Sequence, residues 1–146
     1  MVRINLLPHR EARRKERRTA FVAMLIAAVF VGGLVTYSNE SKAKLIGVKA
    51  ETLAAHGAVS EATVREMAEG ARTVLGADYG MAVTGTAGPA GGTAEKPVGT
   101  VWIGLAIANK TLALRQFNAY DRETFKYVTS QQALNVLRRM LRELKS

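Results

Sequence analysis

The sequence predicts a layered α/β domain over residues 38–146. Three observations lead to this fold class. A helical pattern covers Ser60–Leu75, three apolar strand-like runs lie between residues 79 and 117, and a second helical pattern closes the chain. The order helix, strand, strand, strand, helix is typical of helices packed on a sheet. With 146 residues, 48% of them hydrophobic, the chain is long and apolar enough for one folded domain.

Local signals place the early helices. Asn39–Ile46 is expected to form a short helix or turn, and Lys49–Ala55 another. Ser60 is a good N-cap for the helix that follows, because its hydroxyl can accept a hydrogen bond from a free backbone N–H group. Gly76 is expected to end that helix near Leu75.

Three strands and a final helix are expected next. Tyr79–Thr84 is a short apolar strand. Val98–Ile107 is apolar on both faces, which predicts a central strand, whereas Leu112–Phe117 alternates more like an edge strand. Arg122–Lys145 carries apolar residues at helical spacing and is expected to be the closing helix.

Charge and composition restrict the function. The chain has no cysteine, which excludes a disulfide framework, a thiolate metal site and a cysteine nucleophile within it. Its histidines, His9 and His56, are isolated in the sequence, so we expect no metal site. Seven of the 21 basic residues lie in residues 1–18, beside only two acidic ones. A nucleic-acid partner is not expected, because the chain shows no aromatic stacking platform.

Residues Thr19–Tyr37 carry no charge. As a helix they would span roughly 28 Å, about the thickness of the bilayer core. The basic residues before them would keep that end in the cytoplasm. The alternative is a buried helix that runs into a first strand over Leu34–Tyr37, whose residues favour strand.

The segment Val83–Thr100 is dense in glycine and lies between two expected strands. Glycine is costly to order, so such a loop is usually kept where backbone amides approach a phosphate or carboxylate closely. The alternative is an exposed hairpin loop without a ligand. The candidate binding residues come directly after a strand and are Thr84, Gly85, Thr86, Ala87 and Gly88.

Other polar groups are weaker candidates. Ser38 and Lys42 are four residues apart, so one helical turn would place both on one face, where a desolvated lysine can act as a base. Lys96 and Arg122 could reach an anion, and Asp121 could cap the last helix. A helix cap and solvent-facing charges are the alternatives for all of them.

From about Gly33 onward the chain resembles the C-terminal domain of CinA, the nicotinamide mononucleotide amidohydrolase family. The segments that carry the resemblance are VTYSNESKAKLIGV (35–48), HGAVSEATVREMAEGA (56–71), DYGMAVTGTAGPAGGTAEKPVGTVW (78–102) and the Asp-Arg pair (121–122). The resemblance implies a three-layer α/β/α fold. It also implies hydrolysis of the nicotinamide carboxamide to a carboxylate plus ammonia, without a metal or organic cofactor, in a cytoplasmic protein that associates with itself.

Site residues follow from the same resemblance. Ser38, Asn39 and Lys42 match the family's Ser-Asn-Glu-x-Lys element near the active site. The resemblance implies that Lys42 polarises the amide or acts as base. It also implies that Thr84–Gly88 form a ligand loop whose amides hold a phosphate or an oxyanion. Lys96 and Arg122 are expected to assist in substrate binding.

The N-terminal residues depart from that family. The family's first helix, first strand and Ala-Glu-Ser-Cys-Thr-Gly-Gly type motif are not found in these 146 residues. In their place, residues 1–32 resemble PilN, a type IV pilus assembly protein. That resemblance implies that the motif Ile4, Asn5, Leu6, Leu7 and Pro8 binds the actin-like protein PilM, and that a membrane helix follows.

The chain therefore looks like a join of two proteins near residues 28–34. The two parts conflict, because a spanning helix would carry residues 38–146 out of the cytoplasm, away from a nucleotide substrate. The two hypotheses are a weakened or inactive amidohydrolase in the cytoplasm and an inner-membrane interaction protein of the pilus type.

Overall fold

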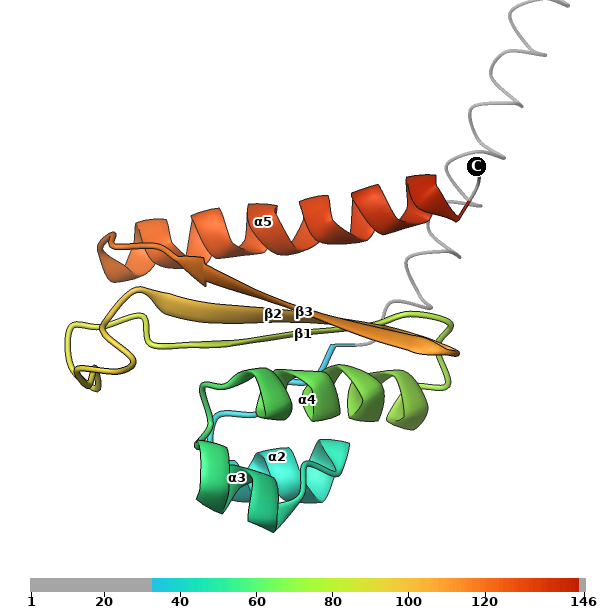
Figure 1. The fold of residues 1–146 in the computed structure, drawn as a ribbon, viewed down its shortest axis with the longest axis horizontal. Helices are drawn as coiled ribbons and strands as arrows, with labels where there is room; N and C mark the ends of the chain where they lie inside the picture. Colours follow the sequence, from blue (N-terminus) through green and yellow to red (C-terminus); the bar gives the residue numbers. More distant parts are fainter. Residues whose placement is uncertain (1–32, 145–146) are drawn as a thin grey trace, which may run out of the picture. The chain divides into compact units, whose positions relative to one another are not determined.

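The computed structural model describes residues 33–144, which form four helices and three strands (Figure 1). The basic arm, the Ile4–Pro8 motif and residues 19–32 of the apolar run lie outside the described residues. In chain order the elements are α2 (Asn39–Ile46), α3 (Ala50–His56), α4 (Glu61–Val74), β1 (Gly80–Gly85), β2 (Thr100–Ile107), β3 (Lys110–Phe117) and α5 (Arg122–Glu143).

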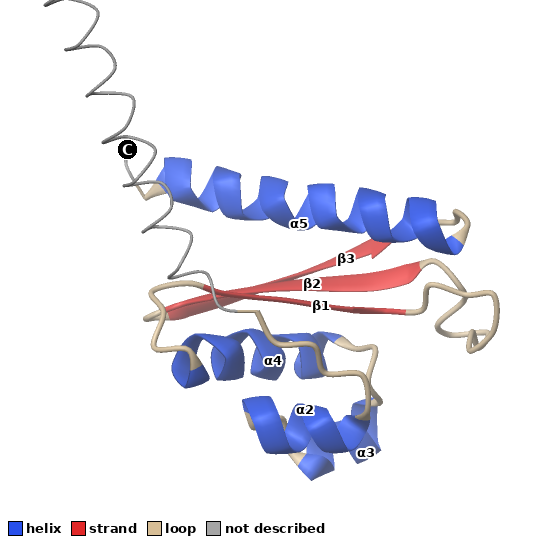
Figure 2. Ribbon diagram, turned by 180° about the vertical axis from the view of Figure 1, so that it is seen from behind, coloured by secondary structure: helices blue, strands red, loops and turns tan. Residues whose placement is uncertain are grey.

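The strands form one antiparallel sheet in the order β1-β2-β3. Helix α5 covers one face of this sheet and α4 covers the other, with α2 and α3 beyond α4 (Figures 1 and 2). The layered α/β arrangement expected from the sequence is therefore present in residues 33–144. The prediction that the second strand is central and the third is at an edge is also confirmed.

Capping explains where the helices begin. The Ser60 hydroxyl accepts a hydrogen bond from the Thr63 N–H at 3.2 Å, so Ser60 caps α4 as the sequence predicts. Lys49 precedes α3 and provides no side-chain cap. Instead, the Glu66 carboxylate accepts from the Lys49 N–H at 2.9 Å and from the Thr52 hydroxyl at 2.8 Å. The start of α3 therefore depends on a residue of α4.

The expectation of a first strand over Leu34–Tyr37 is wrong. These residues form neither strand nor helix, and Val35 and Tyr37 are 89% and 85% exposed. Their apolar side chains have no partner face among the described residues, which removes the main reason for them to join the sheet. The apolar helix expected over 19–37 accordingly does not extend through residues 33–37. No helix in the described part is long and apolar enough to cross a membrane.

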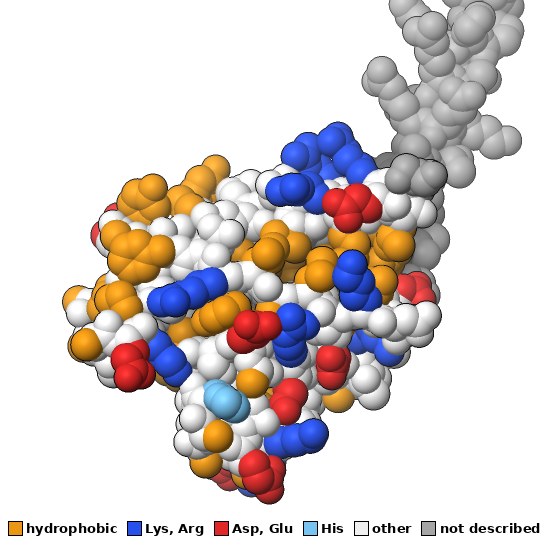
Figure 3. All heavy atoms as spheres, viewed as in Figure 1, with side chains coloured by type: hydrophobic (Ala, Val, Ile, Leu, Met, Phe, Trp, Pro, Cys, Tyr) orange, Lys and Arg blue, Asp and Glu red, His pale blue; other side chains and the backbone are white. Residues whose placement is uncertain are grey.

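Charged side chains of both signs are spread among hydrophobic ones on the face drawn in Figure 3. Each ion pair between residues 33 and 144 joins two residues that are three or four positions apart on the same helix. The pairs are Lys44–Glu40 on α2, Arg65–Glu61 on α4 and Lys126–Glu123 on α5. Such exposed pairs contribute only about 0.3–0.5 kcal/mol each. The fold therefore depends on its apolar layers.

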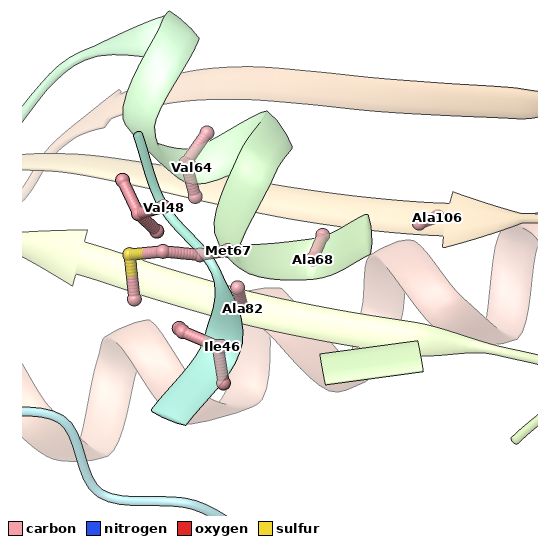
Figure 4. Close-up of a cluster of buried hydrophobic side chains, with 7 residues drawn as sticks. All are labelled: Ile46, Val48, Val64, Met67, Ala68, Ala82 and Ala106. Atoms are coloured by element: carbon pink, nitrogen blue, oxygen red, sulfur yellow. The ribbon is translucent and has the colours of Figure 1, made fainter. Parts of the chain in front are cut away.

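The sheet has a hydrophobic cluster on each face. On the α4 side seven residues pack together (Figure 4): Ile46, Val48, Val64, Met67, Ala68, Ala82 and Ala106. On the α5 side the cluster comprises Val101, Ile103, Phe125 and Ala133. Strand β2 contributes alternate residues to both clusters, which is why its sequence is apolar on both faces.

Helix α4 lies unusually close to its neighbours. A Cβ atom built on Gly104 of β2 would lie 2.5 Å from the Val64 carbonyl oxygen. At Gly80 of β1 a Cβ would meet the Ala68 carbonyl oxygen. On the other side of α4, a Cβ on Gly70 would collide with the Ile46 carbonyl of α2. Glycine at these positions lets the helix backbone contact the sheet and α2 directly.

We expect the substitution Gly104→Ala to destabilise the domain by about 1–3 kcal/mol, the usual cost of overpacking a core. The added methyl group meets a backbone carbonyl, which cannot rotate away, so α4 has to move from the sheet. Denaturant unfolding followed by circular dichroism measures the loss. Gly33→Ala is the control, because no atom lies within 4 Å of a Cβ there. Equal stability of the two variants would contradict the close approach.

Candidate functional site

Ser38 is the cap of α2. Its hydroxyl accepts from the Ser41 N–H at 3.0 Å, and the Ser41 hydroxyl accepts from the Ser38 N–H at 3.0 Å. This reciprocal pair satisfies two N–H groups at the start of the helix. Asn39, the first residue of α2, is exposed, and its side chain forms no hydrogen bond with residues 33–144. The Ser38 hydroxyl therefore has a structural role.

Lys42 is the unusual residue of this segment. Its side chain is on a buried face of α2, four residues before the core residue Ile46, and only 6% of Lys42 is exposed. Its Nζ donates to the Thr36 carbonyl oxygen at 3.0 Å and lies 3.5 Å from that of Tyr37. No carboxylate in the described residues pairs with it. Burial lowers the pKa of Lys42 below its usual value of 10.5, because the charged form loses hydration.

The glycines of the loop after β1 mostly contact the protein's own chain. A Cβ on Gly88 would lie 2.6 Å from Val98 Cγ1, and one on Gly92 would lie 2.7 Å from the Val98 nitrogen. At Gly99, with φ of 100°, a Cβ would lie 2.9 Å from the Asn118 oxygen. The glycine density that the sequence analysis linked to a ligand is thus largely explained by the way this loop folds on itself.

The backbone and hydroxyl groups of the loop are only partly paired within residues 33–144. The Thr86 N–H donates to the Thr100 carbonyl at 2.9 Å, and the Thr84 hydroxyl donates to the Ala58 carbonyl at 2.8 Å. By contrast, the N–H groups of Ala87 and Gly88 have no hydrogen-bond partner within residues 33–144. Two successive free N–H groups can hold an anion.

The two cations predicted to bind substrate are engaged with backbone carbonyls. Lys96 Nζ donates to the His56 carbonyl oxygen at 2.5 Å, which fastens the loop to the end of α3. Arg122 Nη1 donates to the Gly88 carbonyl oxygen at 3.1 Å, which fastens the same loop to α5. Both residues position the loop, and each must release a carbonyl or use its remaining N–H groups to reach an anion.

Sequence reasoning missed several residues of this region. Asn118 is 3% exposed and exchanges hydrogen bonds with Gln132 of α5, so it anchors the end of β3. The Thr100 hydroxyl is buried and has no partner in the described part of the chain. The Asn118–Gln132 contact joins segments distant in sequence, and the burial of Thr100 depends on tertiary packing, so no local pattern reveals either.

The predicted residues fall into two groups. Asn39 and Lys42 lie on α2, with Ser38 as its cap. Arg122 contacts the backbone of the loop at Gly88, whereas Lys96 joins the loop to the His56 carbonyl at the end of α3. No hydrogen bond or ion pair between the described residues joins these groups. A depression of about 560 Å³ lies elsewhere, between α4 and the β2–β3 turn, and is lined by residues such as Arg72 and Lys110. Residues 33–144 contain no cluster of potential metal ligands.

Comparison with known proteins identifies consistent relatives. The family model described as the CinA C-terminal domain matches residues 25–141. A CinA-like protein of Shewanella loihica is 53% identical over 112 residues, which are 76% of this chain and 26% of that protein. A putative competence-damage inducible protein of Moorella thermoacetica is 47% identical over 113 residues, 77% of this chain and 27% of that one. The chain thus spans about a quarter of the length of these curated relatives.

Solved structures agree with these matches. The crystal structure of the competence damage-inducible protein A from Klebsiella pneumoniae has a TM-score of 0.72 at 44% identity, and the match covers 75% of this chain and 68% of that chain. The protein CihA from Agrobacterium tumefaciens has a TM-score of 0.69 at 41% identity, covering 72% and 65%.

We expect the stability of the wild-type protein to rise relative to Lys42→Met as the pH is raised from neutral toward 10.5. The folded protein holds the Lys42 proton less tightly than the unfolded chain does, so protonation opposes folding until it is removed. Unfolding midpoints measured across this pH range test the expectation. Lys44→Met should follow the wild type, because the Lys44 side chain is 72% exposed. Parallel profiles for the wild type and Lys42→Met would contradict it.

Proposed function

The chain belongs to the CinA C-terminal domain family, and we propose that its described domain carries the residues of a carboxamide hydrolase acting on a nicotinamide nucleotide, with Lys42 as the base. The observation that carries this proposal is the burial of Lys42 without a carboxylate partner. The substrate class, nicotinamide mononucleotide, is the one that the family resemblance implies.

A desolvated lysine suits this reaction. A lowered pKa makes the neutral amine available nearer to physiological pH, and a neutral amine can accept a proton. In the proposed reaction, a water molecule attacks the carboxamide carbon while Lys42 removes a proton from that water. The C–N bond then breaks, and the proton passes to the leaving nitrogen, which departs as ammonia. The products are the carboxylic acid and ammonia, which ionise near neutral pH to the carboxylate and the ammonium ion.

The free N–H groups of Ala87 and Gly88 supply the second part of the proposal. Hydrogen-bond donors without a partner can stabilise the negative oxygen of the tetrahedral intermediate, or hold the substrate phosphate. Lys96 and Arg122 then act as positioning residues, because they fix the loop that presents these groups.

We expect the activity of this chain alone to be weak. The Ser38 hydroxyl is engaged in capping, and no hydrogen bond or ion pair among residues 33–144 joins α2 to the loop. A catalytic site that is loosely assembled loses much of its rate.

Nothing found supports the pilus-type alternative. Its motif, Ile4–Pro8, lies outside the described residues, and the relatives found give it no support. The family match begins at residue 25, inside the stretch that was assigned to a PilN-like protein. The expected join at residues 28–34 therefore falls within the matched segment, and no observation favours a chimera.

The test is ammonia release from nicotinamide mononucleotide by the purified full chain. We expect slow release that increases with pH as Lys42 loses its proton. Lys42→Ala should lower kcat by about 10²–10⁴-fold, the usual contribution of a general base, with a smaller effect on KM.

Lys44→Ala is the matched control, since Lys44 is on the same helix but is exposed and paired with Glu40. It should leave the rate unchanged. Unchanged release by Lys42→Ala would remove this lysine from the mechanism, and complete absence of release from the wild type would refute the activity for this chain.

A further inference from the structure

The depression of about 560 Å³ lies at the end of the sheet away from the loop after β1. One wall is a face of α4 that includes Arg65, Glu69 and Arg72, and the other is the β2–β3 turn with Lys110 and Thr111. Figures 1 and 2 show this turn beside the C-terminal half of α4. Sites for small molecules have volumes of roughly 300–1,000 Å³. The depression is therefore large enough for a small ligand.

Hydrogen bonds fix its two walls relative to each other. The Thr111 hydroxyl donates to the Glu69 carboxylate at 2.7 Å, and the Arg65 guanidinium donates to the Thr111 carbonyl oxygen. Arg65 also donates to the Glu61 carboxylate at 3.0 and 2.8 Å. Arg65 and Glu69 thus hold α4 against β3, and they shape the depression before any ligand arrives.

Two cations of the lining, Arg72 and Lys110, have no hydrogen bond or ion pair with residues 33–144. Arg72 is half-buried, and a Cβ built on Gly80 would lie 2.6 Å from the Arg72 Cβ, so the base of this side chain packs against the start of β1. The described residues of the lining include three basic side chains and one acidic side chain, an excess of two positive charges. This charge favours an anionic ligand.

We propose that the depression binds a small phosphomonoester, with its phosphate group between Arg72 and Lys110. At pH 7 such a group carries a charge of about −1.5 to −2, which two cations match. A carboxylate carries one charge and would leave one of the two cations without a counterion. The planar guanidinium of Arg72 can donate two hydrogen bonds to phosphate oxygens, and the Lys110 ammonium can donate another.

This site is separate from the proposed hydrolysis. Neither Lys42 nor any residue of the loop after β1 lines the depression, so a phosphomonoester could bind there whether or not the domain cleaves an amide. The remainder of the ligand would lie beside Ile107 and Ala108, which line the same depression.

The test is a titration of the full chain with phenyl phosphate, followed by the NMR chemical shifts of the backbone amides. We expect saturable shifts at the amides of residues 108–111 and at Arg72. Benzoate, which carries a carboxylate on the same ring, should bind about tenfold more weakly, because it forms fewer charge-assisted hydrogen bonds.

Arg72→Gln and Lys110→Gln should each weaken the binding of phenyl phosphate by about tenfold, since each removes a hydrogen-bond donor that carries a charge. Arg115→Gln is the matched control. It removes one positive charge from β3, but Arg115 does not line the depression, so its dissociation constant should equal that of the wild type. Circular dichroism verifies that all three variants are folded.

Three outcomes would overturn the proposal. The first is the absence of saturable shifts at the amides that line the depression, including the case in which shifts occur only at Ala87 and Gly88, the loop of the proposed function. The second is equal weakening by Arg115→Gln, since the effect would then come from net charge. The third is equal binding of benzoate, which would remove the preference for phosphate.

Discussion

The backbone contact of α4 with its neighbours determines the rest of the domain. Gly104 allows α4 to lie directly against the sheet, and Gly70 allows α2 to lie directly against α4. With α2 held so closely, Ile46 enters the core, and Lys42, four residues earlier on the same side, is drawn out of water. A lysine in that position loses hydration without gaining a carboxylate, and its lowered pKa follows. The burial of Lys42, the candidate base, thus follows from the close packing that glycine allows at Gly104 and Gly70.

Elements with strong local signals could be predicted from the sequence. Ser60 caps its helix, β2 is central, and Asn39–Ile46 is helical, because capping and apolar patterning act over a few residues. The strand expected over Leu34–Tyr37 failed because strand formation depends on tertiary packing, which local propensity does not encode. The Glu66 cap of α3 was equally hidden, since it acts across 17 residues.

The candidate site was harder to predict than the fold. Lys42 was named from spacing and resemblance, but spacing does not reveal burial, which is what gives this lysine its character. Lys96 and Arg122 were expected to face a ligand, yet both donate to carbonyls that lie 40 and 34 residues away in sequence. A basic side chain that satisfies a backbone carbonyl leaves no pattern in the sequence around it, so only the folded structure distinguishes the two roles.

The loop after β1 shows why composition alone is a poor guide to ligand binding. Glycine permits close approach, but it does not specify what approaches. At Gly88 and Gly99 the neighbour is the chain itself. A ligand can use only those backbone groups that the fold leaves unpaired, and in this loop these include the N–H groups of Ala87 and Gly88. Their cost without a partner is about 1–3 kcal/mol each wherever water is excluded. A bound anion or a neighbouring subunit that shields them from water must therefore also provide, or leave room for, an acceptor.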